Sequence, residues 1–146
     1  MIRKVPLSAV QAAVYKALSQ SITGYEVFDD STPFEDGQLQ TDRCIVIGEV
    51  TGTPTSAKAD SPLWETTVNI HAYSSYRGKK ELDEMLDDIV QVLTYAAENG
   101  QLVISGYYCH GLSIGMVEAF KEEYEEGITW QHGVVRVVIK VEQEEM

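Results

Sequence analysis

The stretch that decides the fold lies between Cys44 and Leu93, and it opens with the apolar segment Ile45-Val46-Ile47-Gly48-Glu49-Val50. A small polar loop at residues 51–61 leads to an alternating segment, Trp64-Glu65-Thr66-Thr67-Val68-Asn69-Ile70-His71-Ala72-Tyr73. In the second segment every second side chain lies on the same face, which is the pattern of a strand with one buried face. We therefore predict a long hairpin over residues 41–75 that projects beyond the body of the protein.

Two amphipathic helices are predicted, one before and one after this hairpin. Each carries apolar residues three and four positions apart, so that they form a single stripe along the helix. The first, at residues 7–22, has its stripe at Leu7, Val10, Val14, Ala17, Leu18 and Ile22. The second, at residues 79–98, has its stripe at Leu82, Met85, Leu86, Ile89, Leu93 and Ala96.

The remaining segments complete a sheet. A short strand is expected at residues 25–28, and the polar, turn-rich residues 29–42 are expected to form a loop. Two later strands are indicated by alternation, the first at Leu112, Ile114, Met116 and Phe120 and the second at Val135, Val137, Ile139 and Val141. An acidic hairpin turn at residues 121–127 joins them, and residues 142–146 form an acidic tail.

The order of elements predicts the fold class. It reads helix, three strands, helix, two strands, and neighbouring strands are expected to pair as hairpins. We predict a single α+β domain over residues 1–146, with a largely antiparallel sheet of four to five strands and two helices packed on one face.

Composition narrows the classes of function. The net charge is −12 over 146 residues, which argues against binding to a nucleic-acid backbone. It is explained either by solubility or by an acidic wall along which DNA could pass without sticking. There is no run of ~18 apolar residues for a membrane span and no secretory signal, so a cytoplasmic origin is expected.

The sequence shows no motif that carries chemistry. It lacks a Walker A motif, G-x-G-x-x-G, H-E-x-x-H and G-x-S-x-G. The histidines His71, His110 and His132 are interpreted as half-exposed strand residues, although a zinc site of Cys109, His110 and His132 is conceivable. Cys44 and Cys109 are interpreted as small buried hydrophobes. We expect no enzyme activity, no catalytic residue, no metal and no cofactor.

Several short motifs resemble, in order and spacing, the tail-completion proteins of long-tailed bacteriophages and prophages, also called tail terminator or tail-to-head joining proteins. The first motif is Ile45-Val46-Ile47-Gly48-Glu49, and the second is the strand ending in Tyr73. A linker, Ser75-Tyr76-Arg77-Gly78, then leads into a helix that begins with Lys80-Glu81-Leu82. The last strand is introduced by Trp130-Gln131-His132-Gly133.

The resemblance implies a structural virion protein at the tail–head junction, made in the cytoplasm of a bacterial host. Such a protein forms a ring, commonly a hexamer, that caps the head-proximal end of the tail tube and ends tail polymerisation. Its implied partners are other copies of itself, the major tail tube protein and the head connector or neck protein. DNA passes through without specific binding, and no membrane, enzyme activity or cofactor is implied.

Three groups of residues are candidates for these interfaces. The loop after the first long strand offers Thr53, Thr55 and Lys58, which could join a neighbour's sheet. The linker before the second helix offers Tyr76 and Arg77. The acidic turn offers Glu122, Glu123, Glu125 and Glu126, where charge reversal is expected to leave folding intact.

Three alternatives to a tail-completion protein stay open. The first is another neck or head-completion protein of the same virion, because such proteins also form rings on small α+β scaffolds. The second is a small metal-dependent hydrolytic enzyme that uses the acidic helix or the histidine strands. The third is a monomeric regulatory domain of a bacterial host.

Overall fold

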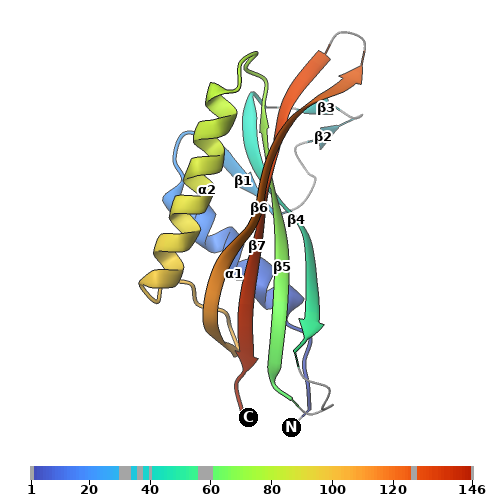
Figure 1. Cartoon of the computed structure of the whole chain (residues 1–146). Coiled ribbons are helices and arrows are strands. Elements are labelled where there is room, and N and C mark those ends of the chain that lie inside the picture. Colours follow the sequence, from blue (N-terminus) through green and yellow to red (C-terminus); the bar gives the residue numbers. More distant parts are fainter. Residues whose placement is uncertain are drawn as a thin grey trace.

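A five-stranded sheet in the order β1-β4-β5-β7-β6 carries two helices on one face, as Figure 1 shows. The computed structural model describes residues 2–29, 34–35, 38–39, 41–55, 61–125 and 128–145, with the backbone alone at 34–35, 38–39, 123–125 and 128–129. The helices and strands are α1 (Leu7–Ser21), β1 (Glu26–Phe28), β2 (Phe34–Glu35), β3 (Gln38–Leu39), β4 (Arg43–Pro54), β5 (Leu63–Ser74), α2 (Lys80–Glu98), β6 (Tyr107–Glu125) and β7 (Ile128–Gln143). The predicted single α+β domain is confirmed.

The sheet is antiparallel except at one edge. The β4–β5, β5–β7 and β6–β7 pairs are antiparallel, whereas β1 pairs with β4 in parallel. This exception differs from the expected pairing of neighbours as hairpins. Its reason is the connection of β1 to β4 through residues 29–42, which the sequence predicted as a loop and which contain the small antiparallel pair β2–β3.

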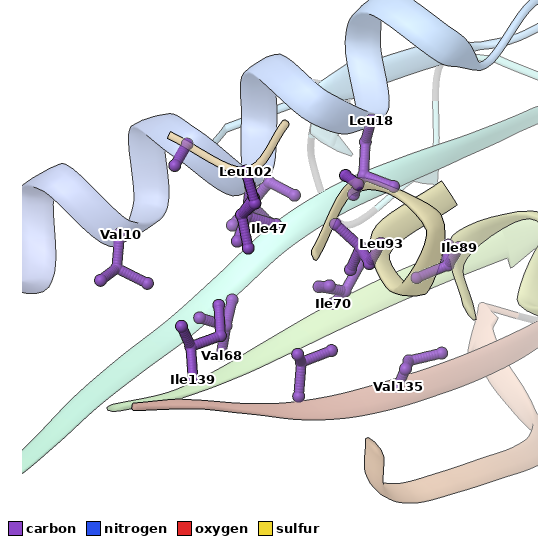
Figure 2. Packing of buried hydrophobic residues seen from close by; sticks show 14 of the residues in the cluster. Val10, Leu18, Ile47, Val68, Ile70, Ile89, Leu93, Leu102, Val135 and Ile139 are labelled. Carbon is purple, nitrogen blue, oxygen red and sulfur yellow. The ribbon is translucent and has the colours of Figure 1, made fainter. Parts of the chain in front are cut away.

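The core lies between the two helices and the helix-covered face of the sheet (Figure 2). Val10 and Leu18 of α1 and Ile89 and Leu93 of α2 point toward strand residues such as Ile70. All six residues of the predicted α2 stripe are buried. Apart from Ala96, each such side chain contributes roughly 1.5–3 kcal/mol on burial, so this stripe is a main reason why α2 forms and docks. Neither helix in the described part of the chain is long and apolar enough to cross a bilayer.

The helix α2 approaches β7 closely at Gly133. A Cβ atom at this position would lie 2.8 Å from Cδ2 of Leu86, which is closer than carbon atoms pack. The missing side chain therefore lets Leu86 rest on the β7 backbone. This contact fixes the height of α2 above the centre of the sheet.

The prediction that Leu112, Ile114, Met116 and Phe120 of β6 share one face is wrong. Leu112 and Ile114 do lie on the core side, opposite Ile139 and Val137. A register shift between Ile114 and Met116 then inserts one extra residue, and the alternation changes sides. As a result Met116 and Phe120 lie on the face away from the helices, where Phe120 is opposite His132.

Among the described residues, the hairpin that extends beyond its neighbouring strands is the β6–β7 hairpin, and the tip of the β4–β5 hairpin at residues 56–60 lies outside them. β5 pairs with β7 over its whole length, up to Ser74 opposite Gln131. The β6–β7 ladder continues past this point, with Glu122 opposite Trp130 and Glu125 opposite Ile128 (Figure 1). The acidic residues predicted in a turn over 121–127 therefore lie mainly in β6. Both chain termini lie at the opposite end of the sheet.

Candidate functional site

The predicted interface residues separate into two sets at opposite ends of the sheet. Thr53 and Thr55 lie exposed at the end of β4, next to the start of β5 and on the same side as the chain termini. Lys58, from the same predicted group, lies outside the described residues. Thr53 and Thr55 therefore do not share one continuous surface with the acidic residues of β6 on a single subunit.

The other set gathers at the end with the projecting hairpin. Tyr76 is 55% exposed, and the backbone carbonyl of Arg77 accepts a hydrogen bond from Nε2 of Gln131 on β7 at 3.4 Å. Glu122, Glu123 and Glu125 lie on β6 at this end, whereas Glu126 lies outside the described residues. An open hollow of about 650 Å³ adjoins the linker and is lined by Asp42, Ser75, Tyr76, Arg77, Gly78 and Glu81.

Hydrogen bonds hold the linker between β5 and α2 in place. The buried Ser74 hydroxyl donates to Oε1 of Glu81 at 2.6 Å, and it accepts from the backbone N–H of Tyr76 at 3.2 Å. Nη1 of Arg43 lies 3.8 Å from the other carboxylate oxygen of Glu81. The first turn of α2 is thus held against β4 and β5, and the backbone of Tyr76 is held by Ser74.

A second buried cluster lies on the face of the sheet that the helices leave uncovered. Its members are Cys44, Val46, Tyr73 and Trp130, with Phe28 packed beside them. Burial, reinforced by the charge of Glu26, raises the pKa of the Cys44 thiol to about 12. Burial likewise raises the pKa of Tyr73. Both groups are therefore uncharged near neutral pH.

His132 belongs to this region and corrects the expectation of a half-exposed strand residue. Only 6% of its surface is exposed. Its ring stacks on Tyr73 at a centroid distance of 4.2 Å and lies 4.6 Å from the ring of Phe120. The aromatic neighbours on β5 and β6 thus cover the imidazole from both sides.

Four polar side chains form a continuous row across the strands β4, β5, β7 and β6. Oε2 of Glu49 lies 3.4 Å from Nε2 of His71, and Nδ1 of His71 lies 2.9 Å from Nε2 of His132. Nδ1 of His132 lies 2.8 Å from Oε1 of Glu122, a contact that is short but poorly aligned for a hydrogen bond. We call these four residues the histidine row.

The local backbone makes room for the histidine row. Gly48 lies at a register shift between Ile47 and Val50, and a Cβ atom there would be 2.5 Å from Cδ2 of His71. The Nδ2 group of Asn69 donates to Oε2 of Glu49 at 3.1 Å and holds this carboxylate beside the ring. Burial opposes the ionisation of Glu49, but these hydrogen bonds and the nearby His71 lower its pKa on balance.

Burial and the neighbouring carboxylate shift the pKa of His132 in opposite directions. Burial lowers its pKa, whereas the nearby carboxylate of Glu122 raises it, and the net direction is downward. The ring is therefore harder to charge than an ordinary imidazole of pKa ~6.5. Glu122, which the sequence placed in a solvated turn, is instead a neighbour of a buried ring.

His110 stands apart from the histidine row. It is half exposed on β6, and its Nε2 lies 2.9 Å from Oε1 of Glu142. Cys109 pairs with Val141 near the C-terminal end of β7, whereas His132 lies opposite Phe120 toward the other end. The conceivable zinc set of Cys109, His110 and His132 is thus not assembled. No group of three or more metal-binding side chains is arranged for a metal ion anywhere in the described ranges.

Sequence reasoning missed the histidine row because its two rings are 61 positions apart in the chain. Tyr73 lies directly opposite His132, and His71 lies opposite Val134, so the rings are diagonal neighbours on one face. Only the β5–β7 register brings them together. The one sequence signal was the polar side of each alternating strand, and this does not specify the register.

Comparisons with known proteins agree with this architecture. A chain of the solved structure described as the virion of a native gene transfer agent particle has the same fold, with a TM-score of 0.73 and 19% sequence identity. The alignment covers 94% of this chain and 98% of that chain. No match is found among curated proteins. The family model described as tail completion protein gp17 matches residues 11–142, and the protein therefore belongs to this family.

Proposed function

We propose that this protein caps the head-proximal end of a bacteriophage tail tube, ends tail polymerisation and provides the surface to which the head docks. Membership of the tail completion protein gp17 family over residues 11–142 is the observation that carries the proposal. The role is structural, without a catalytic step or a cofactor. The site of action is the tail–head junction of the virion.

The two ends of the sheet are suited to two different partners. One end presents Tyr76, Arg77 and the projecting acidic hairpin, and the other presents Thr53 and Thr55 beside the chain termini. A protein that joins a tube to a connector needs two separate contact surfaces on opposite sides. We assign the tail tube protein and the head connector or neck protein to these two ends.

A ring is the assembly that fits this role. Contacts between unlike surfaces of identical subunits close into a ring when the rotation permits, and six subunits is the expected number. Simple strand addition along the whole of β6 is disfavoured, because register shifts interrupt it near Gly111, Met116 and Glu125. Subunits are therefore expected to meet through shorter stretches and through side chains.

The negative charge suits a passage for DNA. The chain carries 23 acidic against 11 basic residues, and the projecting hairpin adds Glu123 and Glu125 at one end. Carboxylates repel phosphates, so a lumen lined by them would let DNA slide without binding. In the proposed ring, the hairpins point toward this passage.

The test uses tail tubes assembled from the major tail tube protein of the same phage. Adding this protein is expected to stop tube growth and to place extra density at one end of each tube in negative-stain images. Light scattering of the complex then gives the number of subunits. Tubes that keep growing and carry no end density would contradict the proposal.

A matched pair of variants gives the test a control. Glu123→Lys with Glu125→Lys changes the hairpin, whereas Glu84→Lys with Asp87→Lys makes the same change of charge on the exposed side of α2. The hairpin variant is expected to lose function in capping or docking, and the helix variant is expected to retain it. Equal behaviour of both would remove the hairpin from the interface.

A further inference from the structure

We propose that copies of this chain associate edge to edge, with the outer edge of β4 in one copy pairing antiparallel with the outer edge of β6 in the next. The pairing covers residues 47–53 of β4 and residues 111–117 of β6. It rests on the ring of the proposed function and names the surfaces through which that ring closes. It follows from the exposure, direction, length and side-chain faces of these two edges.

Both outer strands of the sheet have backbone with which no described strand pairs (Figure 1). β1 pairs with β4 only at residues 44–46, so among the described strands nothing pairs with the outer side of β4 beyond Val46. β6 has a described partner on one side alone, which is β7. Every second residue of such an edge directs its N–H and C=O away from the sheet, where these groups can bind a further strand.

Neither edge carries the residues that normally prevent pairing. Natural sheets protect exposed edges with lysine, proline or inward-pointing charges. Residues 47–53 contain one charged side chain, Glu49, residues 111–117 contain none, and neither segment contains proline or lysine. The whole chain is 23% charged, so the depletion of charge is local to these segments. Both edges are therefore open to another strand.

The direction of the strands suits a closed ring. β4 and β7 run the same way, because each is antiparallel to β5, and β6 runs the opposite way. When copies are related by rotation about an axis along the strands, β6 of one copy meets β4 of the next in antiparallel orientation. Contacts between unlike surfaces of this kind close into a ring when the rotation permits. The two ends of the sheet stay free for other partners.

The two edges are matched in length. Residues 47–53 of β4 and residues 111–117 of β6 lie level with the same six residues of β7, 135–140. Each edge has seven residues at this level, because β4 has a register shift between Ile47 and Val50 and β6 has one between Ile114 and Met116. A bulge in one strand disrupts a ladder with a regular partner. Two bulges at the same level let these edges pair without a further shift.

Level-for-level pairing brings apolar side chains together on the helix-covered face. Val50 meets Ile114, and each is only partly buried against the core of its own copy. Between them within one copy lie Val68 and Val137, which are fully buried. The apolar row thus ends at a half-buried side chain on both edges. Pairing continues this row from one copy to the next.

The neighbouring pairs agree with this register. Ile47 meets Val117, which is 47% exposed although Val135, its partner on β7, is fully buried. On the uncovered face Thr51 meets Ser113, and both are small and exposed. Pairing therefore buries apolar side chains on one face and places two hydroxyl groups side by side on the other.

Engineered disulfides test the register. Thr51→Cys with Ser113→Cys places two thiols opposite each other, at the Cβ separation of about 4.5–5.5 Å typical of paired strands and close to that of a disulfide. All variants also carry Cys109→Ser, because Cys109 is only half-buried whereas Cys44 is fully buried. The full-length protein is oxidised with copper phenanthroline, alone and on tail tubes of the same phage. We expect non-reducing electrophoresis to show a ladder of linked copies, which the Cys109→Ser protein lacks.

The single variants reveal the type of interface. Thr51→Cys alone and Ser113→Cys alone are expected to give no linked dimer, whereas an equal mixture of the two gives dimers and nothing larger. A linked dimer in either single variant means that like edges meet, and it overturns the proposal. The absence of linked product from the double variant, both alone and on tubes, overturns it too.

A lysine on the edge gives an independent test in the double-cysteine protein. Val117→Lys places an ammonium group against Ile47 of the next copy, where the group loses its hydration. Val103→Lys is the matched control, because Val103 is 75% exposed and lies outside both edges. The first change is expected to abolish the ladder and the second to leave it intact, with circular dichroism showing that both proteins fold. Equal yields of linked product would overturn the proposal.

The outcomes on tail tubes separate edge pairing from the proposed capping role. Tubes that carry end density without linked copies overturn the edge pairing and leave the capping role in place. Linked copies without end density support the edge pairing and contradict the capping role.

Discussion

Gly48 supports the ring of His71: a Cβ atom at position 48 would lie 2.5 Å from Cδ2 and 2.6 Å from Nε2 of that ring. The backbone of β4 thus forms one wall of the histidine row. The glycine is required here by close approach, because its φ is not in the left-handed region. The position of His71, and through it that of His132, depends on the absence of a side chain on β4.

Gly48→Ala is expected to displace His71 and to destabilise the protein by about 1–3 kcal/mol, the usual cost of overpacking. Gly111→Ala is the matched control, because Gly111 also lies at a register shift and a Cβ there would meet nothing within 4 Å. Urea unfolding of both variants measures the difference. Similar midpoints for the two variants would show that the ring can move aside without cost.

Leu93→Ala is expected to cost about 2–5 kcal/mol, because it opens a cavity where α2 meets the sheet. Leu93 is fully buried in the core. Val103→Ala is the control, since Val103 is 75% exposed and its truncation is expected to change stability by less than ~0.5 kcal/mol. Thermal unfolding of the two variants compares them. A small loss for Leu93→Ala would mean that the helices repack over the gap.

Stability is expected to fall as the pH drops below ~6.5. The folded state holds the pKa of His132 below its usual value through burial, so the unfolded chain binds more protons in this range. The contribution of the neutral ring is fully present above ~6.5 and is lost as the pH falls through the lowered pKa. His132→Gln should reduce the loss of unfolding free energy between pH 7 and 5.5, whereas His110→Gln should leave that loss unchanged. Chemical unfolding at pH 5.5 and 7 measures both variants and the unmodified protein. An equal loss of stability in all three would contradict the prediction.

The acidic residues of the hairpin are expected to differ in their effect on folding. Charge reversal at Glu122 places a cation beside the buried ring of His132, so Glu122→Lys is expected to destabilise the protein by about 1–3 kcal/mol. This modifies the sequence-based expectation that charge reversal in the whole acidic segment leaves folding intact. Glu118→Lys, at an exposed position of the same strand, is the control. Circular dichroism during thermal unfolding distinguishes them, and equal midpoints would mean that the Glu122 contact adds no stability.

The helices could be predicted from the sequence because their signal is local. All six apolar positions proposed for the second helix are buried, since a stripe with a period of 3.6 residues has only one way to face a sheet. The alternating face of β5 was also readable, and Trp64, Val68 and Ile70 are buried as expected. In these elements, the pattern itself specifies which side chains enter the core.

The parts that escaped prediction depend on register between distant strands. The extra residue between Ile114 and Met116 turns the following side chains to the other face, and no local sequence pattern predicts this register shift. The parallel pairing of β1 with β4 and the meeting of His71 with His132 have the same origin. The predicted interface residues divide between two ends of the sheet for the same reason, because chain order does not reveal which ends coincide.

The location of both termini at the end opposite the projecting hairpin has a practical consequence (Figure 1). A bulky fusion partner at either terminus crowds the end with Thr53 and Thr55 and leaves the hairpin end accessible. Fluorescent or affinity tags can therefore act as a steric probe of orientation in the assembled particle. An attachment that blocks binding to the tube but spares binding to the head would assign each end to its neighbour without any change to the folded surface.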